Sequence, residues 1–252
     1  MTEFAALHRT GEPLLLPCAW DHASAHLLAG QGFEAIGTTS LGVAAAAGMP
    51  DAAAATREET LRLALVLGSG PFLLSVDAEG GFSDDPGEVA ELARRLWTLG
   101  AVGINLEDGS GSADLHAEKI AAVKAAVPGL FVNARTDTCW LGDGDDSTET
   151  ARRLDLYQQA GADGVFVPGL SEPRAISALV RQLAVPLNVL YTPGGPGVAH
   201  LTDLGVRRIS LGSLLYRHAL GAAVTAAVRV RDGRPPEGTA PPYEAIRALA
   251  TP

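Results

Sequence analysis

Two carboxylates two residues apart, Asp77 and Glu79, follow an apolar run and precede a pair of glycines. In a β-strand, residues i and i+2 point to the same face, so these two acids would share a face while Val76 and Ala78 point the other way. Two such carboxylates repel each other unless they share a proton, meet a cationic side chain or bind a metal ion. The alternative is a pair of solvated acids at a strand–loop junction. This stretch alone leaves both interpretations open.

Other polar residues fall near the ends of neighbouring predicted strands. The alternation of apolar and polar residues predicts that Glu107, Arg135 and Asn188 point inward, as Asp77 and Glu79 would. Three inward carboxylates are costly if unpaired, and oxygen ligands with no nearby histidine favour Mg²⁺, or alternatively Mn²⁺, over zinc. Arg135 can offset one negative charge, and its guanidinium fork also suits a substrate carboxylate. A purely structural cluster of salt bridges is the alternative.

The elements that would position these residues are short apolar runs, each followed by a helical segment. Eight such strand–helix units are typical of a (β/α)8 TIM-type barrel, in which inward residues at the carboxyl ends of the strands build the active site. A doubly wound sheet would usually carry G-x-G-x-x-G after its first strand, and Cys18-Ala19-Trp20-Asp21 is unlike it. The predicted strands are 14–21, 35–41, 72–79, 102–107, 130–135, 164–168, 187–191 and 208–211.

The predicted helices are 22–30, 57–67, 86–99, 115–126, 148–160, 173–183, 197–203 and 214–230, with an alanine-rich, glycine-broken loop expected after the second strand. The barrel would occupy residues 1–231 as a single domain. Residues 232–252 would form a short C-terminal extension, a polar spacer and a helix near 243–249 that packs on the barrel or on a neighbouring subunit.

The bulk composition narrows the class of protein. The chain has 252 residues, 47% of them hydrophobic, and a formal net charge of -10, which argues against nucleic acid or an anionic membrane surface as the main partner. Two cysteines do not make a disulfide framework or a zinc site. The N-terminal residues lack a signal peptide, and no apolar run is long enough to span a bilayer. We therefore expect a cytoplasmic protein with free thiols.

Six motifs occur in register along the chain, from about residue 14 to residue 215, and together they resemble the isocitrate lyase / phosphoenolpyruvate mutase superfamily. Each motif alone is weak, and the ordered set is specific. The resemblance implies a Mg²⁺-dependent barrel that acts on small 2-oxo or 2-hydroxy carboxylates through an enolate or carbanion. It also implies a homo-oligomer, a dimer or tetramer, commonly with C-terminal helices packed between subunits. The motifs are Pro17-Cys18-Ala19-Trp20-Asp21, Thr38–Ala44, Gly48-Met49-Pro50-Asp51, Val76–Gly81, Gly103–Asp108 and Asn133–Asp137.

The resemblance carries roles onto individual residues. Asp77, Glu79 and Glu107 match the metal-site acids, some of which act through water, and Asp51 matches the acid that closes the second loop near the metal. The residues matched to catalysis are Arg135, Asp51 and Glu107, and those matched to substrate binding are Trp20, Thr39, Ser40, Leu41, Asp77, Arg135 and Asn188. The family more often has aspartate where this chain has Glu79.

The lid is where the chain departs from the resemblance. The lyases carry a K-[KR]-C-G-H sequence after the fourth strand, with a cysteine as acid or base, whereas residues 109–116 here contain no cysteine. Glycine and serine would make this short loop flexible, and His116, at the start of the next helix, is expected to be solvated. Cys18 and Cys139 are expected to be bystander thiols. Lys119 and Lys124 both fall on the fourth predicted helix, which disfavours a Schiff-base aldolase.

These features favour a Mg²⁺-dependent lyase or decarboxylase acting on a small 2-oxo acid, with limited need for acid catalysis. Cleavage next to the carbonyl leaves an enolate that a metal ion can stabilise. Two alternatives remain. One is a mutase or hydrolase of P–C bonds, and the other is a non-catalytic barrel that binds 2-oxo acids.

Overall fold

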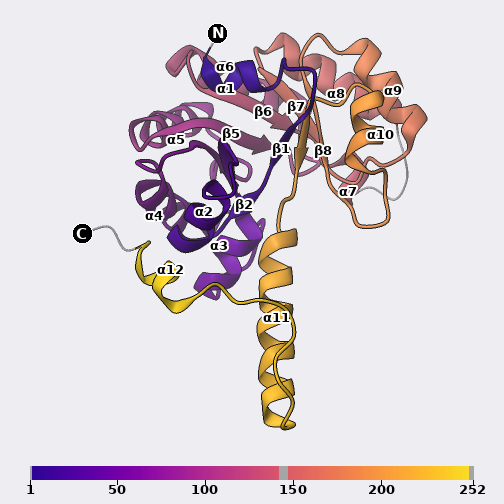
Figure 1. Cartoon of the computed structure of the whole chain (residues 1–252). Coiled ribbons are helices and arrows are strands. Elements are labelled where there is room, and N and C mark those ends of the chain that lie inside the picture. The colour runs from indigo at the N-terminus through magenta and orange to yellow at the C-terminus, as the bar shows by residue number, and fades with distance from the viewer. Residues whose placement is uncertain (1, 142–146, 250–252) are drawn as a thin grey trace.

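In the computed structural model, which describes residues 2–141 and 147–249, parallel strands form a barrel surrounded by helices (Figure 1). The sheet has nine strands in the order β1-β9-β8-β7-β6-β5-β4-β3-β2. β1 (Leu14–Leu16) pairs with β9, and β2 (Cys18–Ala19) pairs with β3, so the two are halves of one first strand interrupted at Pro17. Proline cannot donate to a strand ladder, but the carbonyl of Pro17 accepts from Gly37 N at 2.8 Å. The predicted (β/α)8 TIM-type barrel is therefore confirmed.

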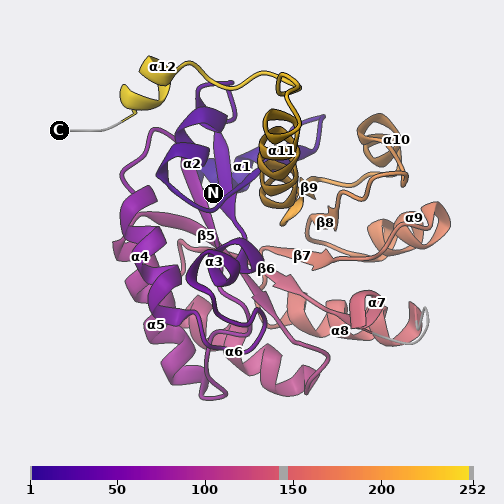
Figure 2. The same ribbon diagram turned by 90° about the horizontal axis from the view of Figure 1, so that it is seen from below.

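The strands and their crossover helices lie close to the predicted ranges, and Figure 2 shows the helices around the strands. The remaining strands are β3 (Ala35–Thr38), β4 (Leu73–Asp77), β5 (Ala101–Glu107), β6 (Phe131–Arg135), β7 (Gly164–Val167), β8 (Leu187–Leu190) and β9 (Arg208–Ser210). The helices that follow the strands are α2 (His22–Ala29), α4 (Arg57–Leu67), α5 (Pro86–Thr98), α6 (Ala113–Ala126), α8 (Ser147–Gln159), α9 (Pro173–Gln182), α10 (Val198–Asp203) and α11 (Leu214–Arg231).

The second strand is shorter than predicted. It ends at Thr38, and the segment expected to be a loop contains the helix α3 (Ser40–Ala47). Alanine is the best helix former, and Gly48 ends the helix in the left-handed region with φ of 68°. The prediction of a strand was therefore wrong for residues 40 and 41, and that of a glycine-broken loop was wrong for residues 42–47. This difference places the N-terminus of α3 at the mouth of the barrel.

A short helix that the sequence did not predict, α1 (Glu3–Leu7), closes the amino-terminal end of the barrel. Phe4 is buried there against Leu16, Ala35 and Phe131. Val102, predicted to point outward, packs on this inner cluster beside a register shift between β4 and β5. A bulge moves one residue out of the alternation, which is why the strict period of two fails there.

The main apolar core lies between the strands and the helices, where Leu74, Val76, Ile104, Val132 and Ala134 are buried. These outward positions agree with the predicted alternation on β4, β5 and β6. The inward positions above the Phe4 cluster are polar. The strands therefore present an apolar face to the helices and polar side chains to the barrel axis.

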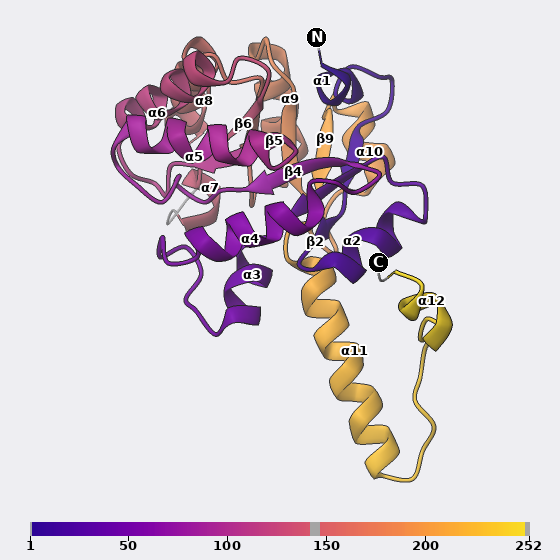
Figure 3. The ribbon, with the colours of Figure 1, turned by 90° about the vertical axis from the view of Figure 1, so that its left-hand side faces the viewer.

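The C-terminal part of the chain leaves the barrel. α11 extends away from the carboxyl ends of the strands, and the following segment runs back along it to α12 (Tyr243–Arg247) (Figures 1 and 3). His22 Nε2 on α2 donates to the carbonyl of Leu249 at 2.8 Å, which ties the end of the described chain to the barrel. Among the described residues no helix is both long enough and apolar enough to cross a bilayer.

Candidate active site

A pocket of about 280 Å³ lies at the carboxyl ends of the strands, where a (β/α)8 barrel places its active site. One side is polar and charged, and another is aromatic and apolar. Its lining residues are Cys18, Thr38, Thr39, Ser40, Leu41, Asp51, Asp77, Asn105, Arg135, Trp140, Phe166, Pro168, Leu190, Tyr191, Ser210, Leu211, Gly212, Ser213, Leu214 and Arg217. The volume suits a small molecule rather than a polymer.

Asp77 joins the end of β4 to the start of α3. Its Oδ2 accepts from the backbone N–H of Ser40 at 3.0 Å, and its own N–H donates to Thr38 Oγ1 at 2.8 Å. Thr39 is the N-cap residue of α3 but makes no side-chain cap bond, so Asp77 satisfies an N–H that the helix leaves open. The positive end of α3 and the carboxylate of Asp77 therefore meet at one wall of the pocket.

Glu79 is held by the loop that follows α3. Its two carboxylate oxygens accept from Thr56 Oγ1 and from Ala54 N. β4 ends at Asp77, and Glu79 adopts a left-handed φ of 46°, so the strand alternation does not set its direction. Burial raises the pKa of Glu79, the bonds from Thr56 and Ala54 oppose this, and the charge of Asp77 adds to the increase. Asp77 and Glu79 are thus close enough for the charge of one to affect the pKa of the other, but they are bonded to different partners.

Arg135, at the end of β6, is the counter-charge of the site. Its Nη1 lies 2.8 Å from Glu107 Oε2, and Asp137 Oδ1 lies 2.7 Å from Nε and 2.6 Å from Nη2. The guanidinium carbon is 5.8 Å from the ring centroid of Phe166. All three guanidinium nitrogens therefore already face protein carboxylates, and a substrate carboxylate would have to share or replace the Glu107 contact.

Glu107, at the end of β5, is a largely buried carboxylate that lies close to other acids. Burial raises its pKa to about 8; the Arg135 guanidinium opposes this, and the carboxylates of Asp77 and Asp137 contribute to the increase. Arg135 alone does not balance the neighbouring acids. A further cation would lower the free energy of this cluster in its ionised form.

A buried polar layer lies beneath the pocket. Arg208 is 1% exposed, donates to Asn105 Oδ1 at 3.0 Å and to Ser210 Oγ at 3.2 Å, and has its pKa lowered by burial to about 10. Asn188 Nδ2 donates to Ser210 Oγ at 3.0 Å. Asn133 Nδ2 donates to Asn105 Oδ1 at 2.8 Å. This layer fixes Asn105 and Ser210, which form part of the pocket lining.

The structure brings most of the predicted site residues together. Those lining the pocket are Thr39, Ser40, Leu41, Asp51, Asp77 and Arg135, and those bonded to the lining or to its loops are Glu79, Glu107 and Asn188. Trp20 is not part of the lining, and its ring contacts Tyr216 edge-on at 5.3 Å between centroids. The roles assigned to these residues stay predictions.

Sequence reasoning missed several residues of the pocket. Asn105 was recognisable from its inward position on a predicted strand, but nothing singled it out for a role. Trp140, Tyr191 and Arg217 lie on segments that follow strands, and no local signal shows that such segments return to the mouth. Arg208 begins the eighth predicted strand and was given no role, yet it is buried beneath the pocket.

The oxygen ligands and the excess negative charge fit a divalent cation such as Mg²⁺. Within residues 2–141 and 147–249, however, no three His, Cys, Asp or Glu side chains form a ready-made metal-binding group. The reason is visible in the contacts, because Asp77 bonds Ser40, Glu79 bonds Thr56 and Glu107 pairs with Arg135. The acids fit such an ion by chemistry and charge, although their present contacts do not gather three of them into one ligand set.

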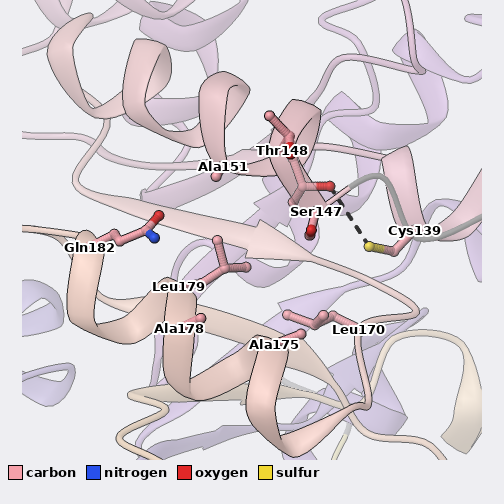
Figure 4. A pocket seen from close by; sticks show the side chains of 10 residues that line it. Cys139, Ser147, Thr148, Ala151, Leu170, Ala175, Ala178, Leu179 and Gln182 are labelled. Atoms are coloured by element: carbon pink, nitrogen blue, oxygen red, sulfur yellow. Dashed lines mark hydrogen bonds between the residues drawn. The ribbon is translucent and has the colours of Figure 1, made fainter.

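The two thiols and the histidine of the short loop are placed differently from one another. Cys18 lines the pocket, and burial raises its pKa to about 12, so the thiol is neutral. Cys139 lines a second cavity of about 320 Å³ between α8 and α9, with its sulfur 3.9 Å from Thr150 Oγ1 (Figure 4). His116, expected to be solvated, is 2% exposed and packs edge-on against Tyr157, so that prediction was wrong. Burial lowers the pKa of His116 to about 4.

Both lysines bond groups outside the pocket. Lys119 Nζ donates to the carbonyl of Gly80 at 3.1 Å and to Asp84 at 3.2 Å. Lys124 Nζ lies 2.6 Å from Asp163 Oδ2. Both lysines lie on α6, as predicted, and neither lines the pocket.

A closed parallel barrel with a charged pocket at the carboxyl ends of its strands defines a (β/α)8 enzyme architecture. Within this class, the chain belongs to the phosphoenolpyruvate phosphomutase family, whose model matches residues 4–231. It is thereby a member of the isocitrate lyase / PEP mutase superfamily that its motifs resemble. Family membership makes it an enzyme of the lyase or mutase type.

Individual relatives cover most of the chain. It is 44% identical over 234 residues to an uncharacterized protein of Mycobacterium tuberculosis H37Rv, covering 91% of this chain and 89% of that protein. It is 32% identical to an oxaloacetate decarboxylase of Pseudomonas fluorescens SBW25, covering 86% and 82%. A crystal structure of a putative lyase/mutase from Burkholderia cenocepacia J2315 superposes with a TM-score of 0.86 at 36% identity, covering 99% and 95%.

Proposed function

We propose that this protein is a Mg²⁺-dependent lyase that breaks a C–C bond of a small 2-oxo or 2-hydroxy carboxylate so that the bonding electrons form an enolate, with decarboxylation of oxaloacetate as the first reaction to test. The observation that carries the proposal is a pocket that contains both positively charged groups and carboxylates. Arg135 and the N-terminus of α3 offer positive charge and N–H donors, while Asp77 and Asp51 offer carboxylates. The similarity to oxaloacetate decarboxylases supports the choice of substrate.

Asp77, Glu79 and Glu107 would hold the ion, directly or through water. When bound, Mg²⁺ supplies positive charge beside the 2-oxo group, where an enolate oxygen develops. The surroundings of Glu107 support this assignment, because burial raises its pKa, the carboxylates of Asp77 and Asp137 add to the increase, and a divalent cation would favour the ionised form. Mn²⁺ has the same ligand preference.

The chain's own residues would bind and orient the acid. The guanidinium of Arg135 and donors of the Thr39–Leu41 segment would hold carboxylate oxygens, which fixes the bond to be broken relative to the carbonyl plane. In oxaloacetate the C3–C4 bond breaks, CO₂ leaves, and the bonding electrons form the enolate of pyruvate. A proton from water then completes pyruvate, so the chemistry needs no lid cysteine.

The test uses purified protein with Mg²⁺ and a panel of oxaloacetate, 2-methylisocitrate, isocitrate and phosphonopyruvate. Pyruvate formation from oxaloacetate is followed by coupling to lactate dehydrogenase. A reaction with Mg²⁺ and no protein reports spontaneous metal-catalysed decarboxylation, and Arg135→Gln, which removes the charge and the fork without adding an amine, tests the guanidinium. We expect turnover above that background for oxaloacetate. If the protein binds 2-oxo acids but converts none of them, the proposal of an enzyme is wrong and the protein is a non-catalytic binder.

Cleavage of P–C bonds is the second candidate function. It is favoured by the family to which the chain belongs, since the family's own name describes a phosphomutase. The same panel separates the two reactions. Conversion of phosphonopyruvate with no turnover of oxaloacetate would assign the chain to phosphonate chemistry.

We further propose that the protein is a homo-oligomer, a dimer or tetramer, joined through α11. The exposed apolar side chains of this helix include Leu220, Val224, Val228 and Val230, and of its residues only Tyr216 is buried. A helix that is apolar around most of its circumference is normally buried, so in water α11 needs a covering surface. A second copy of the same chain supplies an equivalent apolar helix.

A further inference from the structure

We propose that Asp108 is a positioning residue for Arg135, acting through Asp137, and that α8 holds Asp108 in place. The inference rests on the proposed function, in which Arg135 binds the substrate carboxylate. Asp108 does not line the pocket, and the two residues of α8 that hold it are Arg153 and Tyr157.

Asp108 is a buried carboxylate whose two oxygens are both bonded. Its side chain is 0% exposed, and Oδ2 accepts from Arg153 Nη1 at 2.8 Å and from Tyr157 Oη at 2.6 Å. Oδ1 accepts from the backbone N–H of Ser110 at 2.9 Å and of Asp137 at 3.1 Å. A buried charge with this many donors is held in one place, because moving it would leave several polar groups unpaired.

Asp108 bonds the chain on both sides of residue 136. Its backbone N–H donates to the carbonyl of Arg135 at 3.1 Å, and its Oδ1 accepts from the N–H of Asp137. The carboxylate of Asp137 in turn binds Nε and Nη2 of Arg135. The side chain of Arg135 is thus oriented by Asp137, and the backbone that carries Asp137 is fixed by Asp108.

Arg135 needs such support because its side chain is long and has many rotamers. Fixing a long side chain in one conformation costs conformational entropy, which bonded partners must offset. If Asp137 moved, Arg135 would retain Glu107 and Phe166 as partners but lose both contacts of Nε and Nη2 with Asp137 Oδ1. A guanidinium in several poses binds a planar carboxylate more weakly than one held in a single pose.

The same network holds the short loop between β5 and α6. Arg153 Nη1 also donates to the carbonyl of Gly111 at 2.9 Å, and Arg153 Nε donates to Glu149 at 2.7 Å. Ser110, at a left-handed φ of 58°, is tied to Asp108. The loop rich in glycine and serine is therefore bonded to α8 at Gly111 and at Asp108, next to the end of β6.

The test compares Asp108→Asn and Tyr157→Phe with Arg152→Ala. Arg152 is a matched control, since it bonds Glu149 at 2.7 Å on the same helix but does not contact Asp108. The first readout is the nitrogen-15 spectrum of the arginine Nε–H groups, with the signal of Arg135 assigned by its loss in Arg135→Lys. We expect slow exchange of this proton in the parent protein and in Arg152→Ala, and at least tenfold faster exchange in Asp108→Asn.

The second readout is the affinity for oxalate in the presence of Mg²⁺, measured by calorimetry. We expect Kd to rise about tenfold in Asp108→Asn and about threefold in Tyr157→Phe, with no further rise when Asp108→Asn is added to Arg135→Lys. A purely structural role would lower the melting temperature and leave both Kd and the Arg135 proton unchanged, which would overturn the proposal. If Asp108→Asn does not fold, Tyr157→Phe decides by the same criteria.

The two readouts separate this inference from the proposed function. If the parent protein binds no oxalate, the proposed substrate site is wrong, and the exchange of the Arg135 proton still decides whether Asp108 positions that side chain. If the parent binds oxalate and all variants match it in both readouts, the proposed site stands and the role of Asp108 fails.

Discussion

Asp77 joins the end of β4 to the start of α3 and lines the pocket, and it is also a predicted metal ligand. Its carboxylate accepts from the backbone N–H of Ser40 in the first turn of α3, and it lines the same pocket as Arg135. One side chain therefore links the N-terminus of a helix to the charged part of the pocket. The strand pattern anticipated that Asp77 and Glu79 would be neighbours. It did not anticipate that each would be bonded to a different loop, because those loops are distant in sequence and carry no periodic signal.

Replacing Asp77 tests the metal assignment. Asp77→Ala should abolish the rise in melting temperature that Mg²⁺ and oxalate together give the parent protein, because a direct oxygen ligand is lost. Asp77→Asn keeps the bond to Ser40 N and separates the loss of a charged ligand from the loss of a helix cap. Glu91→Ala, an exposed acid on α5, is the control. An unchanged thermal shift in both Asp77 variants would remove Asp77 from the metal site.

Buried histidines should make the fold sensitive to mild acid. Burial, with the charge of Arg208 as a smaller contribution, lowers the pKa of His8 to about 3, and burial lowers that of His116 to about 4. The unfolded chain binds these protons near pH 6.5 and the folded chain does not, so stability is complete above pH 6.5 and falls as pH decreases toward 4. The loss at pH 5 is roughly 2 kcal/mol or less for each histidine.

Urea denaturation at pH 7.5 and pH 5 measures this effect. His8→Phe should reduce the difference in unfolding free energy between the two pH values, since Phe keeps the ring contact with Phe131 but does not titrate. His200→Ala, an exposed histidine on α10, should leave the difference unchanged. An equal pH dependence in His8→Phe and the parent would contradict the assignment.

At the scale of elements, regular strands and crossover helices followed directly from apolar periodicity. β5 and β6 were predicted to within one residue, and the inward positions of Asn105, Asn133 and Arg135 followed from them. α1 and α3 were not anticipated. α1 is only five residues long and is stabilised by packing of Phe4 inside the barrel, which is a tertiary contact. A local pattern cannot report such a contact.

The crossing of α4 with the loop before β5 provides a test of packing at this scale. A Cβ on Gly68 would lie 1.5 Å from the carbonyl oxygen of Leu99, so either the C-terminus of α4 or the loop would have to shift. Gly68→Ala should lower the unfolding free energy by about 3 kcal/mol. Gly11→Ala, where a Cβ meets nothing within 4 Å, should have little effect. Thermal and urea denaturation measure both, and equal stabilities would show that this crossing tolerates a methyl group.

For the whole molecule, the sequence identified the barrel and the carboxyl-end location of the site but not what covers α11. The helix was predicted as residues 214–230, and its alanine- and valine-rich sequence is equally consistent with packing on its own barrel. Only the arrangement in space shows that α11 projects from the barrel (Figure 3). The exposed apolar side chains of α11, and not the periodicity of its sequence, are therefore the reason to infer a surface that covers it.

The oligomer proposal makes a direct prediction about Val224, which is 64% exposed near the middle of α11. A charged side chain buried between two helices is strongly unfavourable, whereas the same side chain in water costs little. Val224→Asp should therefore convert a dimer or tetramer into monomers, measured by size-exclusion chromatography with light scattering. Arg231→Ala, at the exposed end of the same helix, should keep the parent mass. A monomeric parent protein, or an assembly that Val224→Asp leaves intact, would show that α11 is not the surface that joins the subunits.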